Sequence, residues 1–164
     1  MAMILVTDAS SLSSFVLIDC LWLLEAIYGT VVISEVSAGE IAAAKNARIQ
    51  AVLSLNWVQV QAPTEMAIAE VMQQGQQLDQ GDAHAIALAW QLKADELLIN
   101  ERLGRQVAQG LGLSVIGIFG IVIVAKKRAL ISSVRRLMDA LVEQAGFRIS
   151  NQLYQKILRF AGEI

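Results

Sequence analysis

The stretch M-I-L-V-T-D-A-S, residues 3–10, decides the fold class. Its first five residues are an apolar and β-branched run, which is typical of a buried strand, and Asp8 follows the run directly. Residues 11–28 have a helical pattern, and further short strand-like runs occur at residues 30–34, 57–61, 96–99 and 114–117. Strands that alternate with helices imply βαβ crossovers. We therefore predict a three-layer α/β/α fold with a mainly parallel central sheet, in which residues 57–61 form an exposed or edge strand.

Helices are expected between these strands and after the last one. The sequence predicts a helix with an Ala-rich centre at residues 41–45 and helical structure again at residues 47–55. Further helices are expected from Pro63 and Thr64 to residue 73, from Asp82 to about residue 93, at residues 102–109 and at residues 119–128. The glutamine- and glycine-rich segment 73–81 reads as a loop. Apolar residues at helical spacing predict two more helices after residue 131, which pack on the sheet layer or on a second subunit. We expect one domain, residues 1–164, with a core of about residues 1–130 and a helical extension of about residues 131–164.

Composition excludes several classes of protein. The chain has 164 residues, 55% of them hydrophobic, and a net charge of −2, which rules out intrinsic disorder and a DNA-coating protein held by net positive charge alone. The single cysteine, Cys20, rules out a disulfide scaffold and a cysteine-ligated zinc site and favours an intracellular, cytoplasmic protein. Residues 106–125 carry no charge and are long enough to span a membrane. Their glycines and glutamines instead predict a helix end, a strand and a helix start in the protein core, so we expect no membrane span.

Common catalytic motifs are absent from the sequence. There is no phosphate loop of the G-K-[ST] type, and the glycines near residue 112 precede a strand instead of following one, so no dinucleotide fingerprint is present. One histidine, His84, cannot build a histidine-rich metal site, and nothing places a serine or cysteine nucleophile beside it. We read His84 as a satisfied or surface helix residue in preference to a catalytic base.

Four carboxylates remain as candidates for the chemistry. Asp8 follows the first strand, Glu40 lies shortly after the second, Asp82 starts a helix, and Glu101 comes two residues after the strand at 96–99. Taken singly, Asp8 and Asp82 are sensible helix N-caps, Glu40 a solvated residue, and Glu101 a favourable charge in a first helical turn. Parallel sheets, however, gather functional groups at the carboxyl ends of their strands. The four acids are therefore expected to converge in one cleft.

A cluster of carboxylates repels itself and raises the pKa values of its members unless a cation is present. Hard divalent cations prefer oxygen ligands, and Mg²⁺ or Mn²⁺ keeps water positions open. Such an ion lowers the pKa of bound water and stabilises charge on a phosphoryl oxygen, which is the chemistry of phosphodiester hydrolysis.

A basic segment lies next to these acids in the sequence. From residue 102 to residue 138 the chain has basic residues and no acidic one: Arg102, Arg105, Lys126, Lys127, Arg128, Arg135 and Arg136. This segregation predicts either a solvated helix face or a surface that tracks a phosphate backbone. In the second case, RNA affinity depends on Arg135 and Arg136.

The sequence resembles the PIN-domain family, the fold of VapC-type toxin ribonucleases, and in particular a bacterial and archaeal PIN-like subgroup. The matching pieces are V-T-D-A-S (6–10), V-V-I-S-E-V-S-A-G-E (31–40), G-D-A-H-A-I-A-L-A (81–89), L-L-I-N-E-R-L-G-R (97–105) and, in the tail, G-F-R-I-S (146–150) and A-G-E (161–163). The resemblance covers essentially the whole chain.

The resemblance implies roles for individual residues. It makes Asp8, Glu40 and Asp82 the first three metal-binding and catalytic acids, and it puts Ser10 at the place of a small hydroxyl residue beside the first acid. Where the subgroup commonly has Asp-Glu or Asp-Asp, this chain has Asn100-Glu101. Glu101 can carry the fourth charge. In another PIN signature, Asn-Asp, Asn100 is the normal residue and position 101 the acid.

These expectations lead to one function and two rivals. The first is a Mg²⁺- or Mn²⁺-dependent endoribonuclease that cleaves single-stranded or looped RNA, with Ser10, Asn100, Arg102 and Arg105 binding the substrate. A role as the toxin of a toxin–antitoxin pair, a small antitoxin partner and a homodimer formed through the apolar terminal helices accompany it. The rivals are a catalytically silent PIN-like module that binds nucleic acid or protein, and a small-molecule binding protein, which the missing phosphate fingerprint disfavours.

Overall fold

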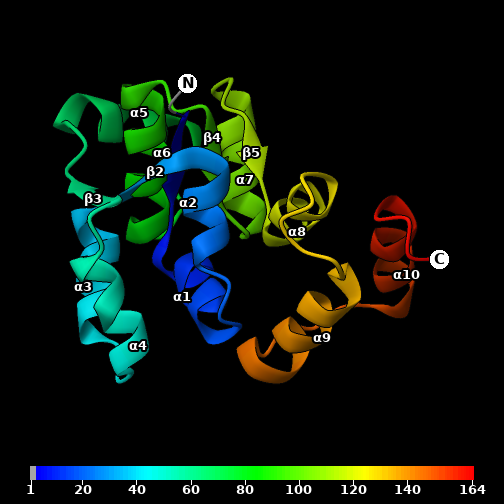
Figure 1. The fold of residues 1–164 in the computed structure, drawn as a ribbon. Helices are drawn as coiled ribbons and strands as arrows, with labels where there is room; N and C mark the ends of the chain where they lie inside the picture. The colour runs from blue at the N-terminus through cyan, green and yellow to red at the C-terminus, as the bar shows by residue number, and fades with distance from the viewer. Residues whose placement is uncertain (1–2) are drawn as a thin grey trace.

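The structure of the protein, a computed structural model, describes residues 3–164, and five strands in them form one parallel sheet (Figure 1). The strand order is β3-β2-β1-β4-β5, and every neighbouring pair is parallel. The strands are β1 (Met3–Thr7), β2 (Gly29–Ser34), β3 (Val58–Gln61), β4 (Glu96–Leu98) and β5 (Val115–Ile116). The predicted parallel sheet and the edge position of residues 57–61 are confirmed, because β3 is an outer strand.

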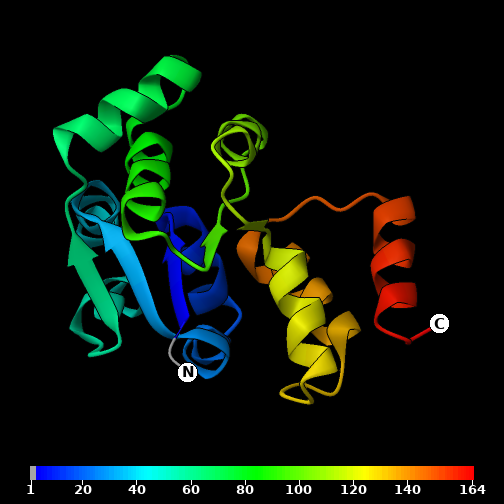
Figure 2. The same cartoon turned by 90° about the horizontal axis from the view of Figure 1, so that it is seen from above.

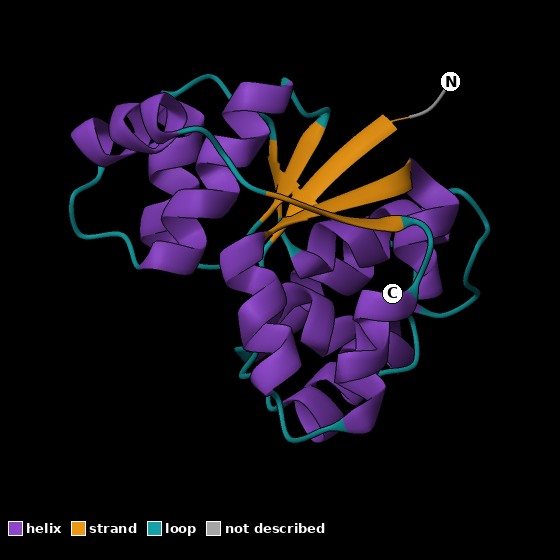
Figure 3. Cartoon of the chain, turned by 90° about the vertical axis from the view of Figure 1, so that its left-hand side faces the viewer, coloured by secondary structure: helices purple, strands orange, loops and turns teal. Residues whose placement is uncertain are grey.

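Helices cover both faces of this sheet (Figure 3). Side chains alternate along a strand, so Leu5 lies in one core cluster and Val6 in the other. The Leu5 cluster takes side chains from α1 (Ala9–Leu17), α2 (Trp22–Tyr28), α3 (Glu35–Ala43) and α8 (Ile118–Lys127). The Val6 cluster takes them from α5 (Glu65–Gln74), α6 (Gln80–Leu92) and α7 (Arg102–Gly110). The predicted three-layer α/β/α architecture is therefore confirmed.

Polar caps begin most of the helices. In each case a side-chain oxygen accepts a hydrogen bond from a backbone N–H of the first turn, which would otherwise have no partner. The caps are Asp8, Ser34, Asn46, Thr64, Asp79, Glu101, Ser133 and Ser150.

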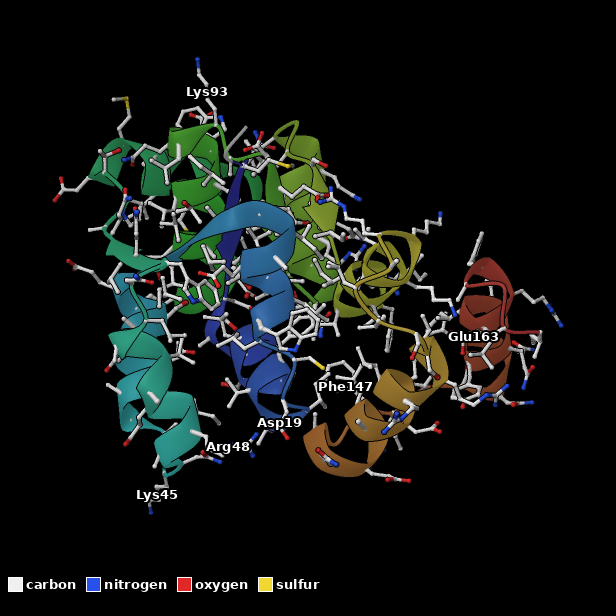
Figure 4. The ribbon with its side chains drawn as sticks, viewed as in Figure 1. Asp19, Lys45, Arg48, Lys93, Phe147 and Glu163 are labelled. Carbon is white, nitrogen blue, oxygen red and sulfur yellow. The ribbon has the colours of Figure 1, made fainter. Side chains whose placement is uncertain are left out.

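Three helix boundaries differ from the prediction. The helical stretch 11–28 is broken into α1 and α2, because Asp19 adopts a left-handed conformation with φ 58° at the turn between them. The Ala-rich stretch 41–45, expected at the centre of a helix, lies instead at the end of α3, which starts at Glu35 behind the Ser34 cap and ends at Ala43. The stretch 47–55 is a short helix, α4 (Ala47–Gln50), followed by a 3₁₀ turn, η1 (Ala51–Ser54). Figure 4 shows Arg48 of α4 beside Asp19, with which it forms an ion pair.

The two C-terminal helices are present as predicted. They are α9 (Val134–Ala145) and α10 (Asn151–Phe160), and they pack with α8 around a separate small core that includes Val122, Met138 and Leu158. The helical spacing of apolar residues predicts a wider buried face on these two helices than the structure has, because Val142 and Leu153 are exposed. Glu163 fixes the arrangement: its carboxylate accepts the backbone N–H groups of Val134 and Arg135, at 2.6 and 3.1 Å.

The uncharged segment 106–125 forms the end of α7, β5 and most of α8, which confirms the predicted helix, strand and helix. In residues 3–164 no single helix has the length and apolarity to cross a membrane. Helices α1 and α2 are long and apolar enough only when they are taken together, and the chain bends by 117° between them.

The strand order reverses at β1, which has β2 on one side and β4 on the other. Open parallel sheets bind ligands outside the carboxyl ends of their strands at such a switch point. In this chain the residues that follow the switch strands are Asp8 after β1 and residues 99–101 after β4.

Candidate active site

Asp8 lies where β1 ends and α1 begins. The strand pairs Thr7 with Leu98 of β4, so Asp8 is held beside the end of β4. Its side chain is only 7% exposed, and its Oδ1 accepts the backbone N–H of Ser11 at 3.0 Å. The Ser10 hydroxyl donates to Asp8 Oδ2 at 3.3 Å. Asp8 is thus both the N-cap of α1 and a buried acid at the switch point, with Ser10 exposed beside it.

Asp82 does not cap its helix, in contrast to the simplest reading of the sequence. The cap of α6 is Asp79, which accepts the backbone N–H of Asp82 at 2.7 Å. Asp82 therefore lies in the first turn, with its side chain only 6% exposed. Because another group caps the helix, the Asp82 carboxylate is free to face the neighbouring acids.

Glu40 extends from α3 across the first turn of α6. A Cβ atom added to Gly81 would lie 3.0 Å from Glu40 Oε1 and 3.5 Å from Asp79 Oδ1. The missing side chain at Gly81 thus leaves space in which both carboxylates approach the first turn of α6. Glu40 and Asp79 are both exposed, so they form the rim above the buried Asp8 and Asp82.

Asn100 and Glu101 are neighbours in sequence, but their side chains lie in different surroundings. Glu101 caps α7 by accepting the backbone N–H of Gly104 at 2.8 Å, and a Cβ atom at Gly104 would lie 3.6 Å from Asp82 Oδ2. Asn100 instead lies near β5, with its Oδ1 3.8 Å from the position of a Cβ atom at Gly117. Glu101 is therefore the acid on the side of Asp82.

The pKa values show that these carboxylates share one electrostatic environment. Burial raises the pKa of Asp8, and hydrogen bonds from Ser11 and Ser10 offset this only in part. Burial, then the charges of Asp79 and Asp8, raise the pKa of Glu40. The largest effect is on Asp82, whose pKa rises to about 7 through burial, followed by the charges of Asp79, Asp8, Glu101 and Glu40.

The other three predicted acids thus act on Asp82, and Asp79 joins them. Sequence reasoning missed Asp79 because it lies in the glutamine- and glycine-rich stretch that reads as a loop. Its only signal is the cap spacing D-x-x-D at residues 79–82. His84, partly buried two residues along α6, is not among the groups that shift these pKa values.

The oxygen donors of this acidic site are of the chemical type that hard divalent cations prefer. They are carboxylates alone, and their mutual repulsion is what a bound cation relieves. In their present positions, however, no three His, Cys, Asp or Glu side chains of residues 3–164 are close enough together to hold an ion. Asp8 and Asp82 are buried, while Glu40 and Glu101 are exposed, and Glu101 is held on the first turn of α7 by its cap hydrogen bond.

The basic segment does not form one surface beside the acids. Lys126 forms an ion pair with Glu163, and Arg135 stacks over the ring of Tyr154 at 5.8 Å. Arg128 acts on the pKa of Tyr28, which precedes β2 and so lies at the amino edge of the sheet. In α7, which starts at the acidic site, Arg102 is exposed and Arg105 partly buried.

Comparison with known proteins agrees with this geometry. A family model described as a PIN domain matches residues 4–163. No curated protein matches the sequence. The parallel sheet flanked by helices is the architecture expected of that family, whose fold is generally a nuclease fold and whose members typically use divalent metals. The chain belongs to the PIN-domain family.

Proposed function

We propose that the protein is a Mg²⁺- or Mn²⁺-dependent ribonuclease. The observation that carries the proposal is the pKa of about 7 at Asp82, caused by burial and by four surrounding carboxylates. A folded protein that keeps five acids together at a switch point has a surface suited to a divalent cation. Membership of a family whose fold is generally a nuclease fold supports the same function.

Asp8, Asp82, Glu40 and Glu101 would hold the ion. A divalent ion at this place supplies a lowered pKa for bound water and stabilises charge on a phosphoryl oxygen. The buried Asp8 and Asp82 give fixed anchors, and the two exposed glutamates close the site from α3 and from the start of α7. Asp79 adds negative charge from the rim, which strengthens attraction of the cation.

The chain also supplies groups that bind and orient a phosphodiester. The Ser10 hydroxyl is oriented by Asp8, and Asn100 offers an amide beside the end of β4. Arg102 and Arg105 follow in α7 and offset the negative charge of the cluster for an incoming phosphate. Single-stranded RNA is the proposed substrate, because its backbone can bend into an edge site of this kind.

The test is cleavage of a labelled single-stranded RNA by the purified protein with Mg²⁺ or Mn²⁺, with EDTA, and with the Asp8→Asn variant. We expect cleavage with either metal, no cleavage in EDTA, and a large loss in Asp8→Asn. If Asp8→Asn cleaves as fast as the parent protein, the activity belongs to another site or to a contaminant. The silent binding module is then the better description.

We further propose a toxin role, which the resemblance to VapC-type ribonucleases supports. Induced expression should then arrest growth, Asp8→Asn should abolish the arrest, and co-expression of the product of a small neighbouring reading frame should relieve it.

A homodimer is proposed on separate grounds: Val142, Leu153 and Phe160 expose apolar surface on the terminal helices. Sedimentation of the protein and of a Phe160→Ser variant tests this.

A further inference from the structure

A cavity lies next to the acidic site and is lined by Asn100, the residue before Glu101. It has a volume of about 590 Å³ and lies between β5, the first turn of α8 and the connection from α9 to α10. In Figure 2 this connection begins beside the end of β5 and runs towards α10. The polar groups that line the cavity are Asn100, Arg105 and Arg148, and its apolar wall includes Phe119 and Phe147.

Arg105 enters the cavity because residue 117 is glycine. A Cβ atom at Gly117 would lie 2.7 Å from Arg105 Nη1, closer than real contacts allow. The guanidinium therefore lies directly against the backbone at the start of α8. Any larger residue at position 117 would displace it.

Arg148 reaches the cavity from the C-terminal extension. The preceding residue, Phe147, packs edge-on against Phe119 of α8, with ring centroids 5.9 Å apart. Its backbone N–H donates to the carbonyl of Leu141 at 3.0 Å, which closes the end of α9. Phe147 thus fixes the connection, and Arg148 is held at the mouth of the cavity.

The two arginines lack an acidic partner. Neither Arg105 nor Arg148 forms an ion pair with any carboxylate in residues 3–164, although both line the same cavity. Two guanidinium groups and an amide in one cavity match the oxygens of a phosphate group, which guanidinium binds through charge-assisted hydrogen bonds.

We propose that this cavity binds a backbone phosphate of the RNA next to the bond that is cleaved, with Arg105 and Arg148 as its ligands. The proposal rests on the proposed ribonuclease function for the identity of the strand. Asn100 and Glu101 then mark the division between two neighbouring sites: carboxylates on one side for the cation, and arginines on the other for a phosphate. The C-terminal extension thereby becomes part of substrate binding.

The experiment measures binding of a fluorescent single-stranded RNA in EDTA, where the proposed cleavage cannot interfere, over a range of salt concentrations. Arg148→Gln should weaken binding about tenfold, as expected for loss of a charged hydrogen bond. It should also make the slope of log affinity against log salt shallower by about 0.7, the value for one phosphate contact on a single strand. The control is Arg159→Gln on α10, an exposed arginine with the same change of charge, which should change affinity less than about twofold.

A second variant tests Arg105 without changing any charge. Gly117→Ala should push the guanidinium out of the cavity and weaken RNA binding, while Gly110→Ala, whose added Cβ meets nothing within 4 Å, should not. Equal affinities for Arg148→Gln and Arg159→Gln would overturn the proposal. If the protein still cleaves RNA with metal while these affinities are equal, the ribonuclease proposal stands and the phosphate-binding role of the cavity is refuted. If RNA binding depends on the cavity but no cleavage occurs, the binding role stands and the ribonuclease proposal is refuted.

Discussion

The Glu101 carboxylate accepts the backbone N–H of Gly104 at 2.8 Å, so the acid that follows β4 is also the cap of α7. A cap fixes the side chain on the first turn of the helix, and the same turn lies against Asp82. Glu101 therefore has a structural role and an electrostatic one, and a test of the second must preserve the first.

Glu101→Gln meets this condition because its amide oxygen can still accept the Gly104 hydrogen bond. If Glu101 is the fourth acid, loss of its charge should lower metal-dependent RNA cleavage about 10–1000-fold, the usual range for a group that binds or orients the metal or stabilises the transition state. Thermal stability should hardly change. A near-neutral effect on cleavage would make Glu101 a helix cap alone.

Asn100→Asp provides the complementary measurement. Because Asn100 lies by Gly117 and Arg105 and not by Asp82, an aspartate there should not act as an extra metal ligand. We expect no increase in cleavage and weaker RNA binding, since the new charge faces the arginines. A clear rise in Mg²⁺-dependent cleavage would instead show that position 100 reaches the metal.

Stability should depend on pH through the acids of the candidate site. The pKa of Asp82 is raised from 3.8 to about 7, so the folded protein keeps a proton that the unfolded chain releases. Stability therefore falls as pH rises from about 4 to about 7, and the penalty is complete above that range. Asp8 and Glu40 act in the same direction, because their pKa values are also raised.

Thermal unfolding in EDTA and in Mg²⁺ tests this dependence. Mg²⁺ binds the ionised acids, so it should raise Tm more at about pH 8 than at about pH 5. Asp82→Asn should reduce both the pH dependence in EDTA and the Mg²⁺ effect. A Mg²⁺ shift at about pH 8 as large in Asp82→Asn as in the parent protein would place the ion elsewhere.

Gly104 is a position where the fold leaves no space for a side chain. A Cβ there would lie 2.8 Å from Cδ1 of Ile99, which is fully buried. Gly104→Ala should lower the free energy of unfolding by about 1–3 kcal/mol through overpacking, more than the roughly 0.5–1 kcal/mol that alanine gains in a helix. Urea unfolding measures this, with Gly110→Ala as the control in the same helix; equal stabilities of the two variants would contradict it.

Glu163 should stabilise the C-terminal extension. Burial alone would raise its pKa, but the hydrogen bonds from Val134 and Arg135 and the charge of Lys126 lower it overall. Its contribution is therefore present above the unfolded pKa and is lost as pH falls below that value. Glu163→Ala should cost about 1–3 kcal/mol near neutral pH. Urea unfolding of Glu143→Ala, an exposed acid of α9, gives the control, and equal losses in both variants would refute the role.

The sheet could be predicted from sequence because buried parallel strands have a strong local pattern. The run that ends at Thr7 and the run that ends at Ser34 are apolar and β-branched, and the acids after them follow from strand direction. The break between α1 and α2 could not be predicted, because the apolar pattern continues through the turn at Asp19.

Only the residues of the candidate site that follow the ends of strands could be predicted from the sequence. Asp79 was missed because its role depends on capping α6, a contact decided by where that helix starts. Arg148 was missed for a different reason: it lines the neighbouring cavity from a segment more than forty residues beyond Arg105, and only tertiary packing of Phe147 brings it there.

The strand order has a consequence for how the chain acquires its shape during synthesis. β1, the first of the five described strands along the chain, is the central one, and its partner β4 ends at Leu98. At a translation rate of about 5–20 residues per second, one side of β1 stays unpaired for on the order of 5–20 s after it leaves the ribosome. The segments that carry Asp8 and Glu101 come together only when β4 closes that side, and Arg148 follows later still. A nascent chain therefore cannot assemble the complete acid set until Glu101 has left the ribosome.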